Sequence, residues 1–195
     1  MFTFTLLLTF WARVMLTSFM PDAAVALPAA ASKTATEASK PFVIEQVIWS
    51  DERKLSWEDF KAQPDDSNPH HALTAANLAV NAKCKDNKYT YVVNCVFLPR
   101  QSWSKNKVSE KLLVHEQLHF DLTEVHARQL RRDLQQLNCT TVKKSLNDVV
   151  SNAFAKWKAE QDTFDEDCRH GLDKSAQKHW ANTIQARLEK LEAYK

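Results

Sequence analysis

The sequence predicts an α+β domain in which a small antiparallel sheet packs on one long helix, followed by two further helices. Two observations lead to this prediction. Runs rich in β-branched and aromatic residues are confined to the first half of the chain, at 42–49, 72–82 and 89–98. From Ser104 to Cys139 the chain has no Gly or Pro, and its apolar residues recur with the period of a helix.

The N-terminal stretch differs in composition from the rest of the chain. Residues 2–20 are strongly apolar apart from Arg13, and runs of alanine follow them. An apolar run before small-residue cleavage sites is typical of a secretory signal peptide. We therefore predict a signal peptide over 1–31, a linker over 32–40 and one domain over 41–195. The expected location is periplasmic or secreted, with membrane contact only during export. Retention of the segment as an anchor is the alternative, although the arginine interrupts the run below the length that spans a bilayer.

The overall charge is nearly balanced. The formal net charge is +2, and no block of Lys and Arg interleaves with aromatic residues. This argues against a nucleic-acid-binding surface, and no nucleic-acid partner is expected. Apolar residues make up 44% of the chain, which indicates a packed domain rather than a disordered one.

The first half of the domain is expected to be mainly β-structure. The first β-rich run predicts a single strand. After it, Ser56 and Asp59 have the spacing of a cap for a short helix over 55–60. The other two β-rich runs flank a turn at 86–88, which predicts a β-hairpin.

Three helices are expected in the second half. The first covers about 108–137, the second about 146–161 after a cap at Ser145, and the third about 174–193. A loop over 162–173 joins the second to the third. One stripe of the third helix is assigned to the core rather than to a cofactor site: Trp180, Ile184, Leu188 and Leu191.

The first of these helices contains the pattern His115-Glu116-x-x-His119. Two histidines four residues apart lie on one face of a helix, one turn from each other, so both imidazoles can reach one Zn²⁺. Glu116 then lies beside the open position of the metal, where it can take a proton from the bound water. We predict one catalytic Zn²⁺ per chain, with His115 and His119 as ligands and Glu116 as the general base. The alternative is an amphipathic helix with two solvated histidines.

A catalytic zinc needs a third protein ligand, and His170 is the preferred candidate. If the second helix folds back antiparallel to the first, the loop after it passes the two histidines of the motif. His170 lies in this loop and precedes Gly171, the only glycine, as expected where the backbone bends sharply near a site. Three acidic residues remain alternatives: Asp165, Glu166 and Glu124.

Three other histidines are assigned to the protein surface. His126 is two turns beyond the motif, about 10 Å along the helix axis, and is expected to be satisfied there. His70 and His71 are adjacent in a polar loop and are expected to be solvated.

The chain has four cysteines, an even number in a chain expected to be exported, which predicts two disulfides. No Cys-x-x-Cys spacing is present, so zinc–thiolate ligation is the lesser alternative. Given the antiparallel helices, Cys84 and Cys139 lie at one end of the domain, and Cys95 and Cys168 at the other. The preferred pairs are therefore Cys84–Cys139 and Cys95–Cys168.

Several motifs occur together in this chain: Trp49-x5-Leu55-Ser-Trp-Glu-Asp-Phe60, Ser102-Trp103, Leu112-Leu-x-His115-Glu-Gln-x-His119-Phe-Asp-Leu, Ala127-Arg-x-Leu-Arg131, and Phe164-Asp165-x4-His170-Gly171 with Gln177-x-x-Trp180. With these motifs the sequence resembles a bacterial family described as secreted zinc-dependent proteases, whose function is unknown. The resemblance implies an exported zincin-like domain with the metal site described above. It also places His170 at the site by position.

The function expected from the motif is hydrolysis of peptide bonds by zinc-activated water, with a peptide or protein as substrate. One alternative is a zinc-dependent amidase that acts on cell-wall material. Another is a module in which zinc has no catalytic role and the domain binds a partner.

Overall fold

The computed structural model describes residues 44–195. The predicted signal peptide, the linker and the start of the domain lie outside the described residues. The elements are β1 (Val47–Ile48), a 3₁₀ turn η1 (Trp57–Asp59), β2 (Ala72–Leu73), β3 (Ala76–Lys85), β4 (Lys88–Phe97), β5 (Trp103–Ser104), α1 (Glu110–Leu134), α2 (Val142–Cys168) and α3 (Lys174–Lys190). Within these residues, no helix combines the length and apolarity needed to cross a membrane.

The predicted hairpin is the main part of the sheet. β3 and β4 pair antiparallel over their full length, and β1 adds to the other edge of β4. The turn is formed by Asp86 and Asn87, whose φ angles of 52° and 57° match the two-residue hairpin turn that Asn and Asp favour. β2 and β5 form a separate two-stranded sheet.

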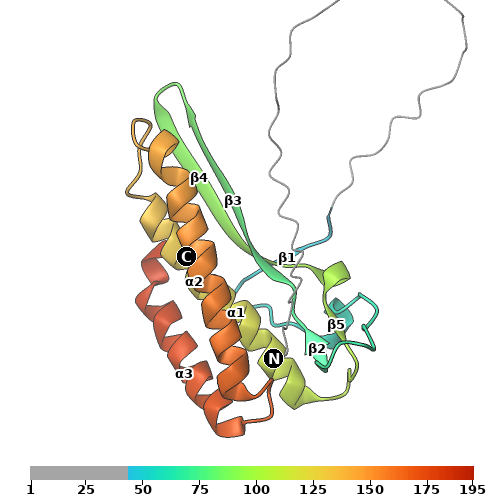
Figure 1. Ribbon diagram of the computed structural model, residues 1–195. Helices are drawn as coiled ribbons and strands as arrows, with labels where there is room; N and C mark the ends of the chain where they lie inside the picture. Colours follow the sequence, from blue (N-terminus) through green and yellow to red (C-terminus); the bar gives the residue numbers. More distant parts are fainter. Residues whose placement is uncertain (1–43) are drawn as a thin grey trace, which may run out of the picture. The chain divides into compact units, whose positions relative to one another are not determined.

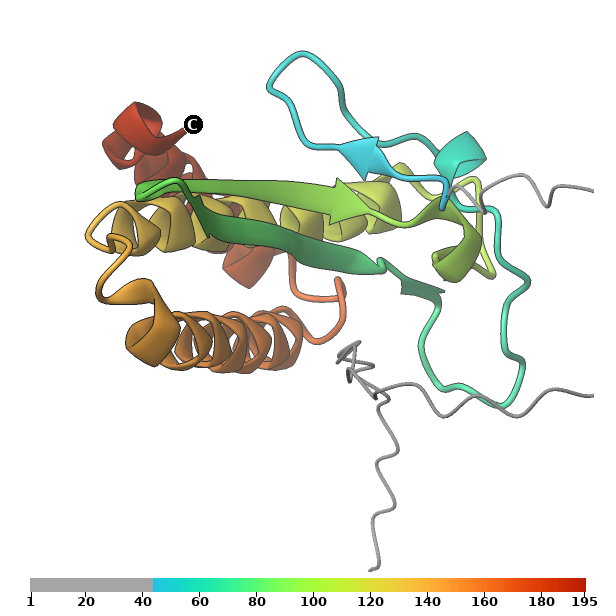
Figure 2. The ribbon, with the colours of Figure 1, turned by 90° about the horizontal axis from the view of Figure 1, so that it is seen from above.

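Helix α1 lies at the centre of the domain (Figures 1 and 2). Its first turn is capped by Ser109, whose side-chain oxygen accepts a hydrogen bond from Leu112 N at 3.2 Å. It packs on β3 and β4 as well as on α2 and α3, so every residue from Phe120 to Arg128 is buried. The predicted α+β class is therefore confirmed, with a small antiparallel sheet on one long helix and two helices after it.

The second helix is longer than predicted. α2 continues to Cys168, so the loop predicted over 162–173 is wrong for its first seven residues. The reason is that Phe164 and Cys168 are both fully buried and continue the face of the helix that packs on α1 and α3. The helix ends at Arg169, which adopts the left-handed conformation with φ 50°.

One of the two predicted disulfides is present. Cys84 and Cys139 are bonded, which ties the tip of the hairpin to the loop between α1 and α2. The predicted pair of Cys95 and Cys168 is wrong, because both thiols are free and buried. The Cys95 thiol donates to the carbonyl oxygen of Phe120. Cys168 lies three residues beyond Asp165, which contacts His115, so the two cysteines are separated by about 12 Å along α1.

Candidate metal centre

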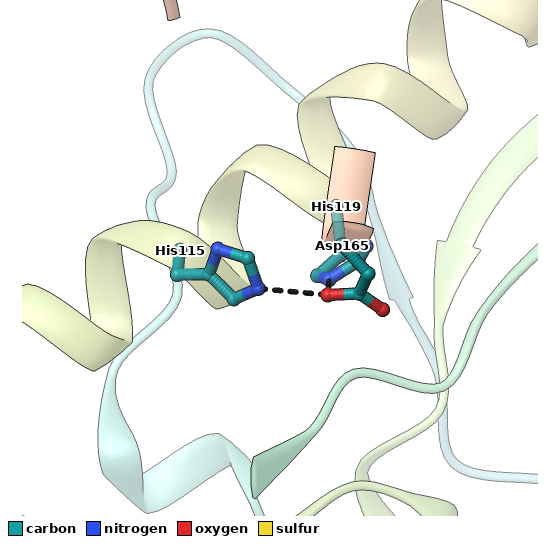
Figure 3. Close-up of side chains that lie close together, drawn as sticks. All are labelled: His115, His119 and Asp165. Atoms are coloured by element: carbon teal, nitrogen blue, oxygen red, sulfur yellow. Dashed lines mark hydrogen bonds and ion pairs between the residues drawn. The ribbon is translucent and has the colours of Figure 1, made fainter. Parts of the chain in front are cut away.

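Helix α1 places the two histidines of the motif on the side that faces α2. The rings of His115 and His119 lie edge to face, with their centroids 4.8 Å apart. Both Nε2 atoms point at one carboxylate oxygen, Oδ1 of Asp165, at 3.0 and 3.1 Å (Figure 3). Asp165 comes from the last turns of α2, within the segment that the sequence analysis assigned to a loop.

A set of side-chain contacts fixes the register of the two antiparallel helices. Gln161, one turn before Asp165, contacts His119 and Thr123, and Trp157 Nε1 donates to Thr123 Oγ1 at 3.1 Å. These contacts confirm the expectation that the second helix folds back on the first. Because the helices are antiparallel, Asp165, one turn after Gln161 on α2, lies beside His115, one turn before His119 on α1.

Gln161 also determines the protonation of the His119 ring. Its amide nitrogen donates to the His119 carbonyl oxygen at 3.0 Å, so its amide oxygen faces His119 Nδ1 at 2.6 Å. This network assigns one ring proton to Nδ1, so Nε2 either offers a lone pair to a metal cation or carries a second proton that it donates to Asp165. A lone pair and a carboxylate oxygen 3.1 Å apart repel each other unless a proton or a metal cation lies between them.

The three donor groups fit a zinc ion. One donor atom from each of His115, His119 and Asp165 lies within 4.8 Å of the other two, and no other such group of three occurs among residues 44–195. Two ligands of a tetrahedral zinc lie about 3.3 Å apart, close to the observed nitrogen–oxygen distances. Two imidazoles and one carboxylate are also a donor set of catalytic zinc sites, which keep the fourth position for water.

The electrostatics of the donors are those of a cation site. Burial alone would raise the pKa of Asp165, but the hydrogen bonds from His115 and His119 hold it far below its usual range. Burial alone would lower the pKa of His119, but the hydrogen bond to Asp165 and the charge of Glu116 raise it above its usual value. The acidic groups therefore favour positive charge at the two rings, whether a proton or a metal ion carries it.

Glu116 lies in the pocket next to these donors and is not one of them. Glu116 as a whole is 3% exposed, and Thr74 Oγ1 donates to its Oε2 at 2.7 Å. Thr74 lies between β2 and β3, so the sheet side of the pocket holds this carboxylate in place. The pocket has a volume of about 120 Å³, and it is lined by His70, His71, Ala72, Leu73, Thr74, Leu112, His115, Glu116, His119, Asp165 and His170.

The family described as "Bacterial protein of unknown function (DUF922)" matches residues 49–171. The chain belongs to this family. No curated protein and no solved structure matches the chain. The matched DUF922 region contains every residue that lines the pocket, and it ends at Gly171, whose backbone packs against the His115 ring.

His170, the preferred third ligand of the sequence analysis, lies beside the three donors. Its Nδ1 is 3.3 Å from Asp165 Oδ1, but no donor atom of His170 belongs to the group described above. The structure thus brings Asp165, one of the sequence alternatives, to the two histidines. A ligand role for His170 stays a prediction.

The other candidates lie away from the donors. Glu166 is exposed. The buried carboxylate of Glu124 accepts hydrogen bonds from Arg128 and Arg131 at Oε1, at 3.0 and 2.8 Å, and from Arg131 at Oε2, at 3.4 Å, so both oxygens are paired. His126 is satisfied as expected, but it is buried rather than on the surface, and its Nε2 lies 2.7 Å from Glu160.

Glu160 is itself a paired carboxylate. Burial raises its pKa, but hydrogen bonds from His126 and Arg187 outweigh this effect and lower the pKa to about 2.

Two residues that contact the site, Thr74 and Gln161, were not predicted from the sequence. Neither lies in a recognisable motif, and each acts through a contact with a residue about forty positions away. No local signal in the sequence identifies them.

Proposed function

We propose that this chain is a zinc-dependent hydrolase that cleaves peptide bonds outside the cytoplasm, in the periplasm or after secretion. The main support for the proposal is the position of Glu116: a buried carboxylate next to three metal donors and not used as one of them. A purely structural zinc site has four protein ligands and no need of such a carboxylate.

The residues of the site divide the work of hydrolysis. His115, His119 and Asp165 would hold the metal. When bound, zinc lowers the pKa of a water molecule and polarises a carbonyl group. Glu116 accepts a proton from the attacking water as the carbon–oxygen bond forms, and it gives that proton to the leaving amine as the carbon–nitrogen bond breaks. Thr74 keeps the carboxylate of Glu116 turned toward the pocket.

The substrate proposal rests on β2. Ala72 and Leu73 line the pocket, and their strand is paired only with β5 among the described strands. An extended peptide can add to such a free strand edge through backbone hydrogen bonds, which places its carbonyl groups in a row beside the site.

The test is peptide cleavage by the purified, zinc-loaded full chain, with Glu116→Gln as the catalytic variant. We expect the variant to keep one zinc per chain and to lose activity by about 10²- to 10⁴-fold, the usual contribution of a general base. Glu110→Gln is the matched control, because Glu110 is exposed in the first turn of the same helix. Full activity in Glu116→Gln, or a zinc-loaded chain that cleaves no member of a peptide library, would overturn the proposal.

A further inference from the structure

The turn after α2 has an unusual backbone. Arg169, His170 and Gly171 have φ angles of 50°, 51° and 80°, so two consecutive residues other than glycine adopt the left-handed conformation. Such conformations are costly and cluster at functional sites, although the hairpin turn at Asp86 and Asn87 has a similar pair of φ angles. The turn is fixed by backbone hydrogen bonds, from His170 N to Asp165 O and from Asp173 N to Cys168 O, both at 2.9 Å.

This backbone holds the His170 ring at the open side of the pocket. The side chain of His170 is 52% exposed, whereas that of His115 is 3% exposed. Its Nδ1 approaches the same oxygen of Asp165 as the two ligand histidines do, at 3.3 Å, yet it is not part of their donor group. His170 therefore approaches Asp165 from the turn after α2, whereas His115 and His119 approach it from α1.

A second histidine orients this ring. His70 lies edge to face with His170, at a centroid distance of 4.5 Å and an interplanar angle of 67°. The backbone of His70 is itself held, because its N–H donates to Asn68 Oδ1 at 2.9 Å. The loop before β2 and the turn after α2 thus meet across the pocket and fix His170 between them.

We propose that His170 is a catalytic residue that donates a ring N–H to the carbonyl oxygen of the substrate, and is not the third zinc ligand. The inference rests on the hydrolase function proposed above. As water adds to the carbonyl carbon and Glu116 takes the proton, the carbonyl oxygen gains a negative charge that a fixed N–H stabilises.

The distances support this role. His170 Nδ1 lies 3.3 Å from Asp165 Oδ1, but no nitrogen of His170 belongs to the group of donors that lie within 4.8 Å of one another. A substrate oxygen held beside Asp165 would therefore be within hydrogen-bonding reach of this ring without the ring completing the donor set. A neutral imidazole always carries one N–H, so the role requires no change of protonation. His70 acts as a positioning residue, since it contacts the ring of His170 and not the reacting atoms.

The experiment compares wild type, His170→Gly and His170→Gln in the full chain loaded with Co²⁺ or Zn²⁺. Glycine removes the ring and adopts a φ of 51° without strain, so this variant keeps the fold. Glutamine supplies an amide N–H in place of the ring. His179→Ala is the matched control, because His179 is exposed on α3. The readouts are metal per chain, kcat and KM on a cleaved peptide, and the affinity of the Co²⁺-loaded protein for acetohydroxamate, followed by its visible spectrum.

We expect all four proteins to bind one metal ion per chain. His170→Gly should lose about 10²- to 10³-fold in kcat with little change in KM, because the interaction forms only as charge develops. Its affinity for acetohydroxamate, an anionic oxygen ligand, should fall about tenfold. The kcat of His170→Gln should be about tenfold higher than that of His170→Gly. His179→Ala should match wild type.

Three results would overturn the inference. If His170→Gly binds less metal per chain than wild type, His170 is a metal ligand. Unchanged kcat together with unchanged acetohydroxamate affinity would make it a bystander. Equal loss in His179→Ala would point to a nonspecific effect.

The two proposals fail separately. If wild type cleaves no peptide but acetohydroxamate binding still depends on His170, the hydrolase function fails and only the interaction of His170 with an anionic oxygen stands. If wild type cleaves peptides and the His170 variants behave as wild type, the hydrolase function stands and the donor role fails. If wild type is inactive and binding does not depend on His170, both fail.

Discussion

Substitution of the only glycine tests how tightly the turn after α2 packs on the metal site. A Cβ at Gly171 would lie 3.1 Å from Cγ and 3.2 Å from Cβ of His115. The His115 ring has nowhere to move, because it is 2% exposed and stacks on Phe164 with a centroid distance of 4.7 Å. Gly171→Ala must therefore displace the turn, the ring, or both.

The cost has two parts. A residue other than glycine at φ 80° costs about 1–2 kcal/mol, and overpacking against a buried ring adds about 1–3 kcal/mol. A total loss of roughly 2–5 kcal/mol in a chain of this size lowers Tm by about 4–20 °C. Because His115 supplies a metal donor, a shift of its ring should also weaken zinc binding by about 10- to 100-fold, as seen when groups that orient a ligand are changed.

The assay is thermal unfolding of Gly171→Ala in a chelator, followed by circular dichroism, together with zinc affinity measured by competition with a chromophoric chelator. Arg169→Gly is the matched control in the same turn, since Arg169 is exposed and has a φ of 50° that glycine adopts freely. Its free energy of unfolding should change by less than about 1 kcal/mol and its zinc affinity not at all. A Gly171→Ala protein with the Tm and zinc affinity of wild type would refute the packing argument.

Three further predictions follow from the structure. Asp165→Ala should abolish stoichiometric zinc binding, whereas Glu166→Ala, which changes an exposed neighbouring residue, should leave one zinc per chain. Equal zinc binding by the two variants would show that Asp165 is not a ligand. Because the pKa of Glu160 is lowered from 4.5 to about 2, the stability that its ionised carboxylate contributes is fully present above about pH 4.5 and is lost as the pH falls toward 2. The pKa shift corresponds to at most about 3 kcal/mol of unfolding free energy, of which solvent screening leaves about 1–2 kcal/mol. If wild type and Glu160→Gln have the same dependence of stability on pH in this window, the pairing of Glu160 with His126 and Arg187 does not stabilise the fold. Reduction of the Cys84–Cys139 disulfide, which closes a separation of 55 residues, should lower the free energy of unfolding by up to about 4 kcal/mol. Two free thiols in unreduced, denatured protein and four after reduction would confirm the pairing, whereas no free thiol before reduction would show that Cys95 and Cys168 are also bonded.

The sequence predicted those parts of the fold that depend on local chemistry. The turn at Asp86 and Asn87, the Gly- and Pro-free helix α1 and the two-histidine motif are each determined by residues close together in the chain. The Cys84–Cys139 pair was also predicted correctly, because a hairpin and two antiparallel helices bring their ends to one place. The predicted Cys95–Cys168 pair was wrong, because the antiparallel arrangement places both cysteines toward the same end of the domain but does not determine how far apart they lie along α1.

The position of Asp165 on a helix opposite the two histidines was not predicted, because the end of α2 was set too early. The prediction stopped the helix at Gln161 and treated the polar residues after it as a loop. The spacing of Trp157, Gln161, Phe164 and Cys168 is 4, 3 and 4 residues, which is the spacing of one continuous helix face. Read to its end, that face would have placed Asp165 on the helix and opposite His115.

The polar residue inside the motif, Gln117, shows why the site involves more than the histidine face of α1. Its amide oxygen accepts from Leu55 N at 2.7 Å, and its amide nitrogen donates to Asp121 Oδ1 at 2.8 Å. Trp49 Nε1 donates to the same oxygen at 2.7 Å. An apolar residue at Gln117 would leave the buried Leu55 without this partner, and such a loss is costly in the interior.

Other segments therefore contact helix α1 on two sides, at the turns that contain the two-histidine motif. The segment from Trp49 to Leu55 contacts one side, and the last turns of α2 contact the side with the two histidines. The matched DUF922 region begins at Trp49 and ends at Gly171, so it starts and ends with residues that make these two sets of contacts. Helix α3 lies beyond the matched region, and it packs on α1 and α2 without contributing a residue to the pocket.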